Sequence, residues 1–416
     1  MAGSPSFNCP ELPFARAAVG LHNWRERPYS AWAFQHVSEL VPSAVIAAPR
    51  NPGSAPEAPA ANAVLDAEVR GSPGQQAESL ERFLTRSQTD RFMVTRGGRL
   101  LVDWRAAHAR AEHPHIVFSI SKSVTAVLAG ILQAEGVLDV KRKVSHYLPQ
   151  AAAGGYSDCS VQNLLDMRAD VAFSEDYLDL SGDYGRYRRA TLWNPPDPAH
   201  DSESLRAFLF SIKKGSGEHG GAFRYLSPNS DLAALLLEQV SGLCYADLMS
   251  RLLWQPMGAN HDAMITVDSE GSPRGAGGIS MSAPDLLQLG QMLLSDGAIG
   301  RTQIVPARWL HDMRHNGDGA AWAGGASAAF LPNGRYRNYW YQMAAPSRVF
   351  FAAGIHGQWL YVDPVRDVVI VKLSSQSLPQ DDALDQNSLA VFSHLSQLAE
   401  EGLQGQSGAL PDGAQP

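Results

Sequence analysis

The segments of this chain that favour β-structure lie towards its two ends, and a long helical stretch separates them. Residues 91–106, "RFMVTRGGRLLVDWRA", are two β-prone runs around a pair of glycines and predict a β-hairpin. Residues 347–376 predict three further strands, the last two joined by a turn at Asp363 and Pro364. We therefore expect one sheet that is built from both ends of the chain, with a helical block inserted between its two parts.

Helical patterns fill the middle of the chain, and several begin at Ser or Asp and stop at Gly. We expect an α/β domain from residues 1–118 and 325–404, a mostly helical domain over residues 119–324, and a disordered tail over residues 405–416. A pocket between the two domains is the expected site. Helices are predicted at residues 77–88, 120–134, 160–168, 202–214, 227–242, 245–254, 282–297 and 385–402.

The net charge of −8 and the lack of a basic stripe argue against nucleic acid as a partner. No window holds the roughly 18 uninterrupted apolar residues of a membrane span. The first 17 residues lack the basic and apolar regions of a secretory signal, so we expect a cytoplasmic protein. The oligomeric state is left open, with a homodimer as one option.

The cysteines give no sign of a disulfide framework or a metal site. Cys9, Cys159 and Cys244 are an odd number and show no C-x-x-C spacing. We therefore expect no metal and no cofactor.

Residues 114–134, "PHIVFSISKSVTAVLAGILQA", carry a single lysine in an otherwise apolar run. Lys122 is the only formal charge between Glu112 and Glu135, and a buried ammonium without a partner is costly. Ser119 and Lys122 fit the pattern S-x-x-K, which places both side chains on one face of a helix. A lysine that is neutral because of apolar surroundings can take the serine proton, and the helix dipole favours the alkoxide. The pair is a candidate nucleophile and base.

The S-x-x-K pattern is short, and chance matches are expected. A second match, "SIKK" at residues 211–214, sits where a helix ends in "KKGSGEHGG", and we interpret it as structural. The structural alternative for Ser119 and Lys122 is a first-turn serine with a lysine that reaches to solvent.

A third polar group is offered by residues 223–231, "FRYLSPNSD". Ser227 can cap a helix that has Pro228 at its first position, which places Tyr225 just ahead of the helix. The phenol of Tyr225 could pass a proton to a leaving group or act as the base itself, and the sequence leaves both open. Its structural alternative is an aromatic ring packed over the helix start.

Two glycines, Gly354 and Gly357, flank Ile355 and His356 within a strand pattern. Glycines in a strand mark a close approach of the backbone, often to a ligand. A backbone N–H there, together with the N–H of Ser119, could form an oxyanion hole. His356 is a weaker candidate for a base, because a lone histidine in a strand is more often structural.

Several segments resemble a known superfamily. "SISK", "RYLSPNSD" and "GIHGQWLYVDPVRDVVIVKLSS", in this order, are similar to the serine β-lactamases and penicillin-binding proteins. The branch that it resembles most contains class C β-lactamases, family VIII carboxylesterases and 6-aminohexanoate-dimer (nylon oligomer) hydrolases. "WAFQHVSELVPSA", "LLDMRADVAFSEDY" and "ITVD" are most similar to the last group, and the likeness runs over about residues 24–376.

The resemblance implies a β-lactamase-like fold, an antiparallel sheet flanked by helices with an inserted helical domain. It implies Ser119 as the acyl-accepting nucleophile, Lys122 as the activating lysine and Tyr225 as the catalytic tyrosine. It also implies an oxyanion hole from the N–H groups of Ser119 and Ile355. Tyr177 matches a loop tyrosine that hydrogen-bonds the scissile amide. The further substrate-binding positions implied or considered are Ser227, Trp340, His356 and Arg188.

The chain departs from this family pattern in places. By spacing, Arg188 stands where amide-active relatives can carry an acid, in a segment read as a loop over residues 178–193. We hypothesise that Arg186, Arg188 and Arg189 bind a carboxylate group of the substrate. The alternative is that they belong to a basic loop that is exposed to solvent. An "NGG" of the family reads as "AGG" at residues 276–278, and "IHG" stands in the region of the β-lactamase K-T-G.

Three functions are compatible with these residues. The first is a serine hydrolase that cleaves small linear amides or esters through an acyl-enzyme on Ser119. The second is a β-lactamase or D,D-peptidase, against which the missing K-T-G counts. The third is a non-catalytic binding member of the fold, against which the complete set of Ser119, Lys122 and Tyr225 counts.

Overall fold

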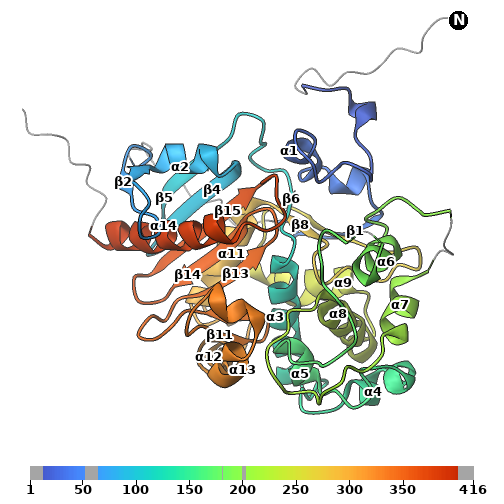
Figure 1. Cartoon of the computed structure of the whole chain (residues 1–416). Coiled ribbons are helices and arrows are strands. Elements are labelled where there is room, and N and C mark those ends of the chain that lie inside the picture. The colour runs from blue at the N-terminus through green and yellow to red at the C-terminus, as the bar shows by residue number, and fades with distance from the viewer. Residues whose placement is uncertain (1–12, 52–63, 180, 199–202, 402–416) are drawn as a thin grey trace, which may run out of the picture.

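A seven-stranded antiparallel sheet forms one half of the molecule (Figure 1). The computed structural model describes residues 13–51, 64–179, 181–198 and 203–401. Strand β15 pairs on one side with β14 and on the other with β4, so the two ends of the chain meet in the middle of this sheet, as expected. In sheet order, the strands are β11 (Arg335–Arg337), β12 (Trp340–Gln342), β13 (Phe350–Gly354), β14 (Gln358–Asp363), β15 (Val368–Ser374), β4 (Thr89–Arg96) and β5 (Arg99–Arg105).

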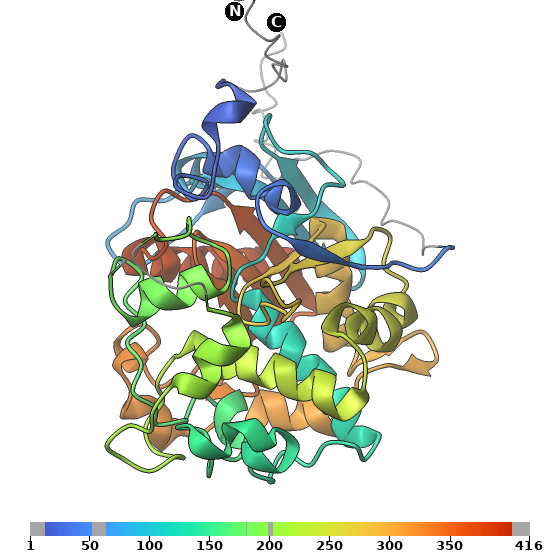
Figure 2. The same ribbon diagram turned by 90° about the vertical axis from the view of Figure 1, so that its right-hand side faces the viewer.

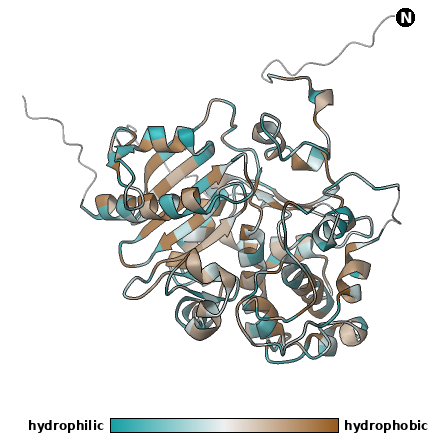
Figure 3. Ribbon diagram, viewed as in Figure 1, coloured by the Kyte–Doolittle hydropathy of each residue, from teal (hydrophilic) through white to brown (hydrophobic). Residues whose placement is uncertain are grey.

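Helices cover both faces of this sheet. Trp359 in β14 packs its ring against Phe392 of α14 (Asp382–Glu400), and α2 (Leu80–Arg86) contacts β4. The next residue, Leu360, points the other way and meets Gly290 of α11 (Ala283–Leu294), because side chains alternate along a strand. A Cβ at Gly290 would lie 2.5 Å from a Val369 methyl group, so glycine is what permits this close packing. Helix α14 shows the alternation of hydrophilic and hydrophobic residues that a half-covered helix needs (Figure 3).

The helical half is organised around α3 (Ile120–Ala134), which runs between it and the sheet (Figures 1 and 2). Every residue of α3 from Ile120 to Leu132 is buried, and the helix packs on α8 (Ser227–Ser241) as well as on β13 and β14. The other α-helices are α1 (Ser30–Ala33), α4 (Val144–Tyr147), α5 (Val161–Leu165), α6 (Asp183–Ala190), α7 (Leu205–Ser211), α9 (Tyr245–Met249), α10 (Gln255–Met257), α12 (Ala307–His315) and α13 (Gly319–Ala323). A π-helical turn spans Ser250–Trp254, and 3₁₀ turns span Arg16–Ala18, Val37–Glu39, Pro149–Ala153 and Ala326–Ala329.

A second sheet of four short strands lies beside α3 and was not expected from the sequence. Its strands hold two to four residues each, too few to show a period of two. In sheet order, they are β1 (Ser43–Ile46), β7 (Ala263–Thr266), β8 (Ile279–Met281) and β6 (His115–Ile116). Two further pairs are β2 (Glu68–Val69) with β3 (Glu78–Ser79), and β9 (Ala298–Ile299) with β10 (Thr302–Gln303).

The expected fold class, an antiparallel sheet flanked by helices with an inserted helical region, is confirmed. The domain boundaries stay a prediction; helix α11, from the segment assigned to the helical domain, packs on the main sheet. The segment read as a loop over residues 178–193 contains helix α6 instead. The expected tail at residues 405–416 lies outside the described residues.

Within the described chain, no single helix is long and apolar enough to cross a membrane. The two helical segments Ser227–Ser241 and Tyr245–Met257, which meet at a bend of 77°, are together long and apolar enough to do so, by length and composition alone. Among the same residues, no group of three or more His, Cys, Asp or Glu side chains is arranged to hold a metal ion.

Candidate active site

Ser119 and Lys122 are in contact at the start of α3. Ser119 occupies the N-cap position, but its side chain caps no backbone N–H, so the hydroxyl is available for other partners. The Lys122 Nζ atom lies 2.9 Å from the Ser119 Oγ atom and donates a hydrogen bond to the Ala276 carbonyl at 2.6 Å. Lys122 is only 1% exposed. It is therefore not a lysine that reaches to solvent, which was the structural alternative.

The surroundings of Lys122 favour the neutral amine. Burial lowers the pKa of the Lys122 ammonium to about 7. The carboxylate of Glu175 raises this pKa, the Arg274 guanidinium lowers it, and Asp231 raises it to a smaller extent. At neutral pH, a substantial fraction of the molecules thus carries an uncharged amine beside the serine hydroxyl.

Tyr225 lies in the extended segment just before α8, as expected, and faces the same pair. The centre of its ring is 4.9 Å from the Lys122 Nζ atom, and it lines the same cavity as Ser119. Burial raises the pKa of the Tyr225 phenol well above its usual value. The phenol is accordingly protonated at neutral pH.

The end of β13 lies against the backbone at Ser119. A Cβ at Gly354 would be 2.7 Å from the Val117 carbonyl oxygen and 3.0 Å from the Ser119 nitrogen, so only glycine allows this approach. In the part of the chain that the structure describes, the Ser119 N–H has no backbone acceptor. Ile355 follows the last residue of β13 and begins the turn to β14, so Ile355 and His356 lie in a turn and not within a strand as expected. Ile355 lines the same cavity as Ser119. The two residues expected to form an oxyanion hole are thus neighbours in space.

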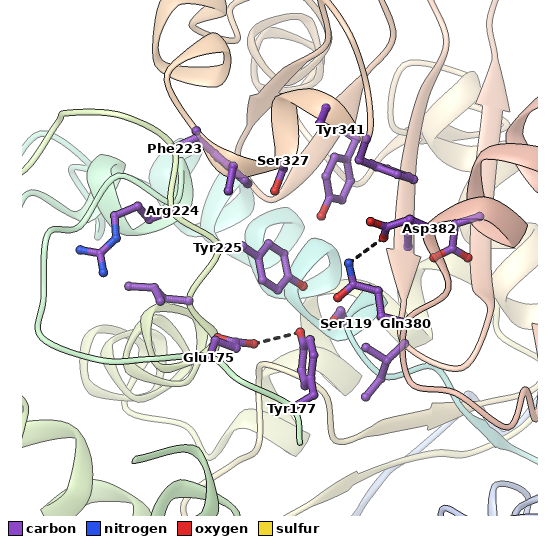
Figure 4. A pocket seen from close by; sticks show the side chains of 18 of the residues that line it. Ser119, Glu175, Tyr177, Phe223, Arg224, Tyr225, Ser327, Tyr341, Gln380 and Asp382 are labelled. Atoms are coloured by element: carbon purple, nitrogen blue, oxygen red, sulfur yellow. Dashed lines mark hydrogen bonds between the residues drawn. The ribbon is translucent and has the colours of Figure 1, made fainter. Parts of the chain in front are cut away.

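Ser119 opens into a cavity of about 820 Å³ between the sheet half and the helical half (Figure 4). Tyr225 and Tyr177 face each other across it, with Ser119 between them and the first turn of α14 on the far side (Figure 4). The polar residues that line it are Ser119, Ser174, Glu175, Tyr177, Arg224, Tyr225, Ser327, Tyr341, Gln380, Asp382 and Asp385.

Glu175 is a lining residue that the sequence analysis missed. Its carboxylate accepts hydrogen bonds from the Tyr177 hydroxyl at 3.1 Å, from the Ser227 hydroxyl at 2.5 Å and from the Ser227 backbone N–H. The carboxylate therefore satisfies the N-terminal end of α8, where a negative charge is favoured. Glu175 stands two residues before Tyr177 in "SEDY", and its partner Ser227 is 52 residues away, so no local pattern marks the glutamate.

Ser227 does not cap α8, although the sequence suggested that it could. The N-cap position of α8 is Leu226, and Ser227 is the first helical residue. Its side chain caps nothing; it is 4% exposed and points at Glu175 rather than lining the cavity. Ser227 acts here by holding the carboxylate.

Besides Ser227, three more of the expected substrate-binding side chains do not line this cavity. Arg188 is 6% exposed, and its guanidinium stacks 4.4 Å from the Tyr184 ring on the buried face of α6. Trp340 is fully buried against Phe350, because the neighbouring Tyr341 takes the cavity side of strand β12. His356 is buried behind the cavity wall and does not line it either.

His356 is 3% exposed, and its Nδ1 atom lies 2.7 Å from the Gln376 carbonyl oxygen. Burial lowers the pKa of this imidazole to about 3, so it stays neutral. Its ring packs against Phe34 and Phe118. These contacts agree with the structural interpretation of a lone histidine.

The other two arginines that were hypothesised to bind a substrate carboxylate also lie away from this cavity. Arg186 pairs with Glu203, and Arg189 lines a separate pocket.

Comparisons with known proteins bear on this arrangement. A family model described as Beta-lactamase matches residues 80–392. A 6-aminohexanoate-dimer hydrolase of Paenarthrobacter ureafaciens is 33% identical over 365 residues, which cover 86% of this chain and 89% of the relative.

Solved structures are similar in fold. A Bacillus anthracis protein, provisionally described as a 6-aminohexanoate-dimer hydrolase, matches with a TM-score of 0.84 at 22% identity, over 93% of this chain and 98% of that one. A family VIII carboxylesterase matches with a TM-score of 0.54 at 16% identity, over 75% of this chain and 95% of the esterase.

Proposed function

Because this chain belongs to the beta-lactamase family and is a hydrolase of the serine type, we propose that it cleaves small linear amides or esters through an acyl-enzyme on Ser119. The observation that carries the proposal is the 2.9 Å contact between the Ser119 hydroxyl and the buried Lys122 amine, at the wall of an open cavity. The relative from Paenarthrobacter, named for a linear amide substrate, supports the substrate class.

In the proposed first step, the neutral Lys122 amine takes the proton of Ser119 as the oxygen attacks the substrate carbonyl. The N–H groups of Ser119 and Ile355 stabilise the oxyanion that forms. The bond to the leaving group then breaks, and water later hydrolyses the ester on Ser119.

Tyr225 is proposed as the proton donor to the leaving group rather than as the base. Its raised pKa keeps the phenol protonated, whereas the lowered pKa of Lys122 leaves an amine free to accept a proton. The contact of Nζ with the face of the Tyr225 ring keeps the two groups within reach of each other.

A panel of substrates tests the proposal: short p-nitrophenyl esters, the matching anilides, 6-aminohexanoate dimer and nitrocefin. We expect turnover of linear esters and amides, and, after acid quenching, mass spectrometry should find the acyl group on the peptide that contains Ser119. No turnover and no adduct would overturn the proposal. Nitrocefin as the best substrate would favour the β-lactamase alternative.

The activity is expected to rise with pH. Since only the neutral amine can accept the serine proton, kcat/KM should be low when Lys122 is protonated and should increase with a midpoint near 7, the pKa that burial gives this lysine. Because the pKa of Tyr225 is raised above its usual value, no loss from its ionisation is expected below about pH 10. A pH profile of p-nitrophenyl butyrate hydrolysis measures both limbs, and a flat profile between pH 5 and 9 would contradict the role of Lys122.

The charge of the cavity favours substrates that carry an amine. Its lining includes the carboxylates of Glu175 and Asp382, whereas the lining arginine Arg224 is paired with Asp170. Asp385 also lines the cavity, but burial raises its pKa to about 7, so it is only partly ionised at neutral pH. None of Arg186, Arg188 and Arg189, the residues hypothesised to bind a substrate carboxylate, is among the residues that line this cavity. An ω-aminoacyl ester should exceed its uncharged isostere in kcat/KM by roughly threefold to tenfold at low salt, since exposed carboxylates act weakly and are screened.

Two variants with the same change of charge check this preference. Asp382→Asn removes an exposed carboxylate from the cavity wall and should reduce the advantage of the amino ester. Glu81→Gln removes an exposed carboxylate from the outer side of α2 and should leave it intact. Equal rates on the charged and uncharged esters in the unaltered protein would refute the preference.

A further inference from the structure

A buried cluster of charged and polar side chains lies behind the catalytic pair, away from the cavity. It consists of Asp231 from α8, Tyr187 from α6, and Arg274 from the loop before β8, and each is at most 3% exposed. The Arg274 Nη1 atom donates hydrogen bonds to the Asp231 carboxylate and to the Tyr187 hydroxyl, which itself donates to the same carboxylate. The guanidinium also stacks 4.3 Å from the Tyr187 ring. We call these three residues the Asp231 cluster.

The Asp231 cluster is connected to the base through a single residue. The second carboxylate oxygen of Asp231 accepts the Ala276 backbone N–H at 2.7 Å, and the Ala276 carbonyl accepts the Lys122 amine at 2.6 Å. Backbone hydrogen bonds also fix the turn that carries Ala276, because the N–H groups of Gly277 and Gly278 both donate to the Arg274 carbonyl. Asp231 thus fixes the residue to which Lys122 is tied.

We propose that Asp231 and Arg274 are positioning residues for the general base: they hold the Ala276 carbonyl so that the Lys122 lone pair faces Ser119. This inference rests on the proposed function and extends it. A neutral amine has two N–H groups and one lone pair. When one N–H is committed to a fixed carbonyl, fewer orientations of the amine remain, and the lone pair is directed at the hydroxyl 2.9 Å away.

The same two residues act on the charge of Lys122 in opposite directions. The Asp231 carboxylate raises its pKa, and the Arg274 guanidinium lowers it. From the cavity side, Glu175 also raises this pKa, and the un-ionised Tyr225 contributes no charge. Replacing Asp231 by a neutral residue therefore moves the acid limb of the activity to lower pH, and replacing Arg274 moves it to higher pH.

The test compares Asp231→Asn and Arg274→Gln with the unaltered protein. Two readouts are used: the pH dependence of p-nitrophenyl butyrate hydrolysis, and the rate of labelling by a fluorophosphonate probe. We expect midpoints that shift by about half a pH unit or more in opposite directions, and a kcat that falls on the order of tenfold with little change in KM. Folded variants with unchanged midpoints and unchanged kcat would overturn the inference.

Two further variants separate positioning from folding. Asp166→Asn removes another buried carboxylate, which pairs with Arg337 and makes no contact with Lys122, so it should affect stability without moving the midpoint. If neither single variant of the cluster folds, the double variant Asp231→Asn/Arg274→Gln leaves no unpaired charge and decides the matter. A kcat that falls about tenfold supports positioning, and an unchanged kcat refutes it. If the unaltered protein neither turns over the ester nor takes up the probe, the proposed function itself fails, and this inference fails with it.

Discussion

Replacing Ser119 with alanine is expected to reduce kcat/KM by on the order of 10⁴-fold or more and to abolish labelling by a fluorophosphonate probe. Among the described residues, Ser119 supplies the one side-chain hydroxyl that is hydrogen-bonded to the Lys122 amine. The fold should persist, since the Ser119 side chain caps no backbone group and Lys122 keeps its hydrogen bond to Ala276. Steady-state kinetics, gel-based labelling and a thermal melt measure the three expectations.

The chain contains its own matched control for this experiment. Ser211 begins the second S-x-x-K match, at the end of α7, where its hydroxyl donates to the Phe208 carbonyl and accepts a hydrogen bond from Arg186. Ser211→Ala should leave both turnover and labelling unchanged. If Ser119→Ala is labelled as strongly as the unaltered protein, or if Ser211→Ala loses activity as Ser119→Ala does, Ser119 is not the nucleophile.

The features that could be predicted from the sequence are those with a local pattern. The hairpin of β4 and β5 and the strands β13 to β15 are predicted by runs of β-prone residues. Both groups of strands carry apolar side chains that must be buried, which favours a single sheet containing all of them. The contact of Ser119 with Lys122 follows from helical spacing alone. Tyr225 was placed correctly ahead of α8 because Pro228 marks the first turn of that helix.

The features that escaped prediction depend on which side of an element faces the cavity. Trp340 and Tyr341 are adjacent in β12, and only packing decides that the tyrosine lines the cavity. Arg188 lies with Tyr184 and Tyr187 on the buried face of α6. Three of the eight residues of this helix are arginines, so the sequence does not show which of them faces inward.

Contacts between segments far apart in the chain were equally hidden. Glu175 reaches the start of α8 across 52 residues, and the Ala276 carbonyl reaches Lys122 across 154. A backbone carbonyl leaves no mark in the sequence, because any residue type supplies one. The role of Asp231 could therefore be recognised only once Ala276 was seen between it and the lysine.

Replacing Lys122 with methionine is expected to separate activity from stability. Without a base, kcat/KM should fall on the order of 10³-fold, and the acid limb near pH 7 should disappear. Stability should change little: methionine fills similar space without the cost of burying an amine, while the Ala276 carbonyl loses a donor. We expect a Tm within roughly 5 °C of the unaltered protein, measured alongside the pH profile of an uncharged p-nitrophenyl ester.

Lys372 provides the matched control for that variant. It is as buried as Lys122, and burial likewise lowers its pKa to about 7, but its amine donates to Ser374 in β15 instead of facing the nucleophile. Lys372→Met should therefore keep most of the activity on an uncharged ester. Equal losses in the two variants would mean that any buried amine in this fold supports the reaction indirectly. A large loss confined to Lys122→Met, at nearly constant Tm, is the result expected of a lysine whose buried position serves proton transfer from Ser119.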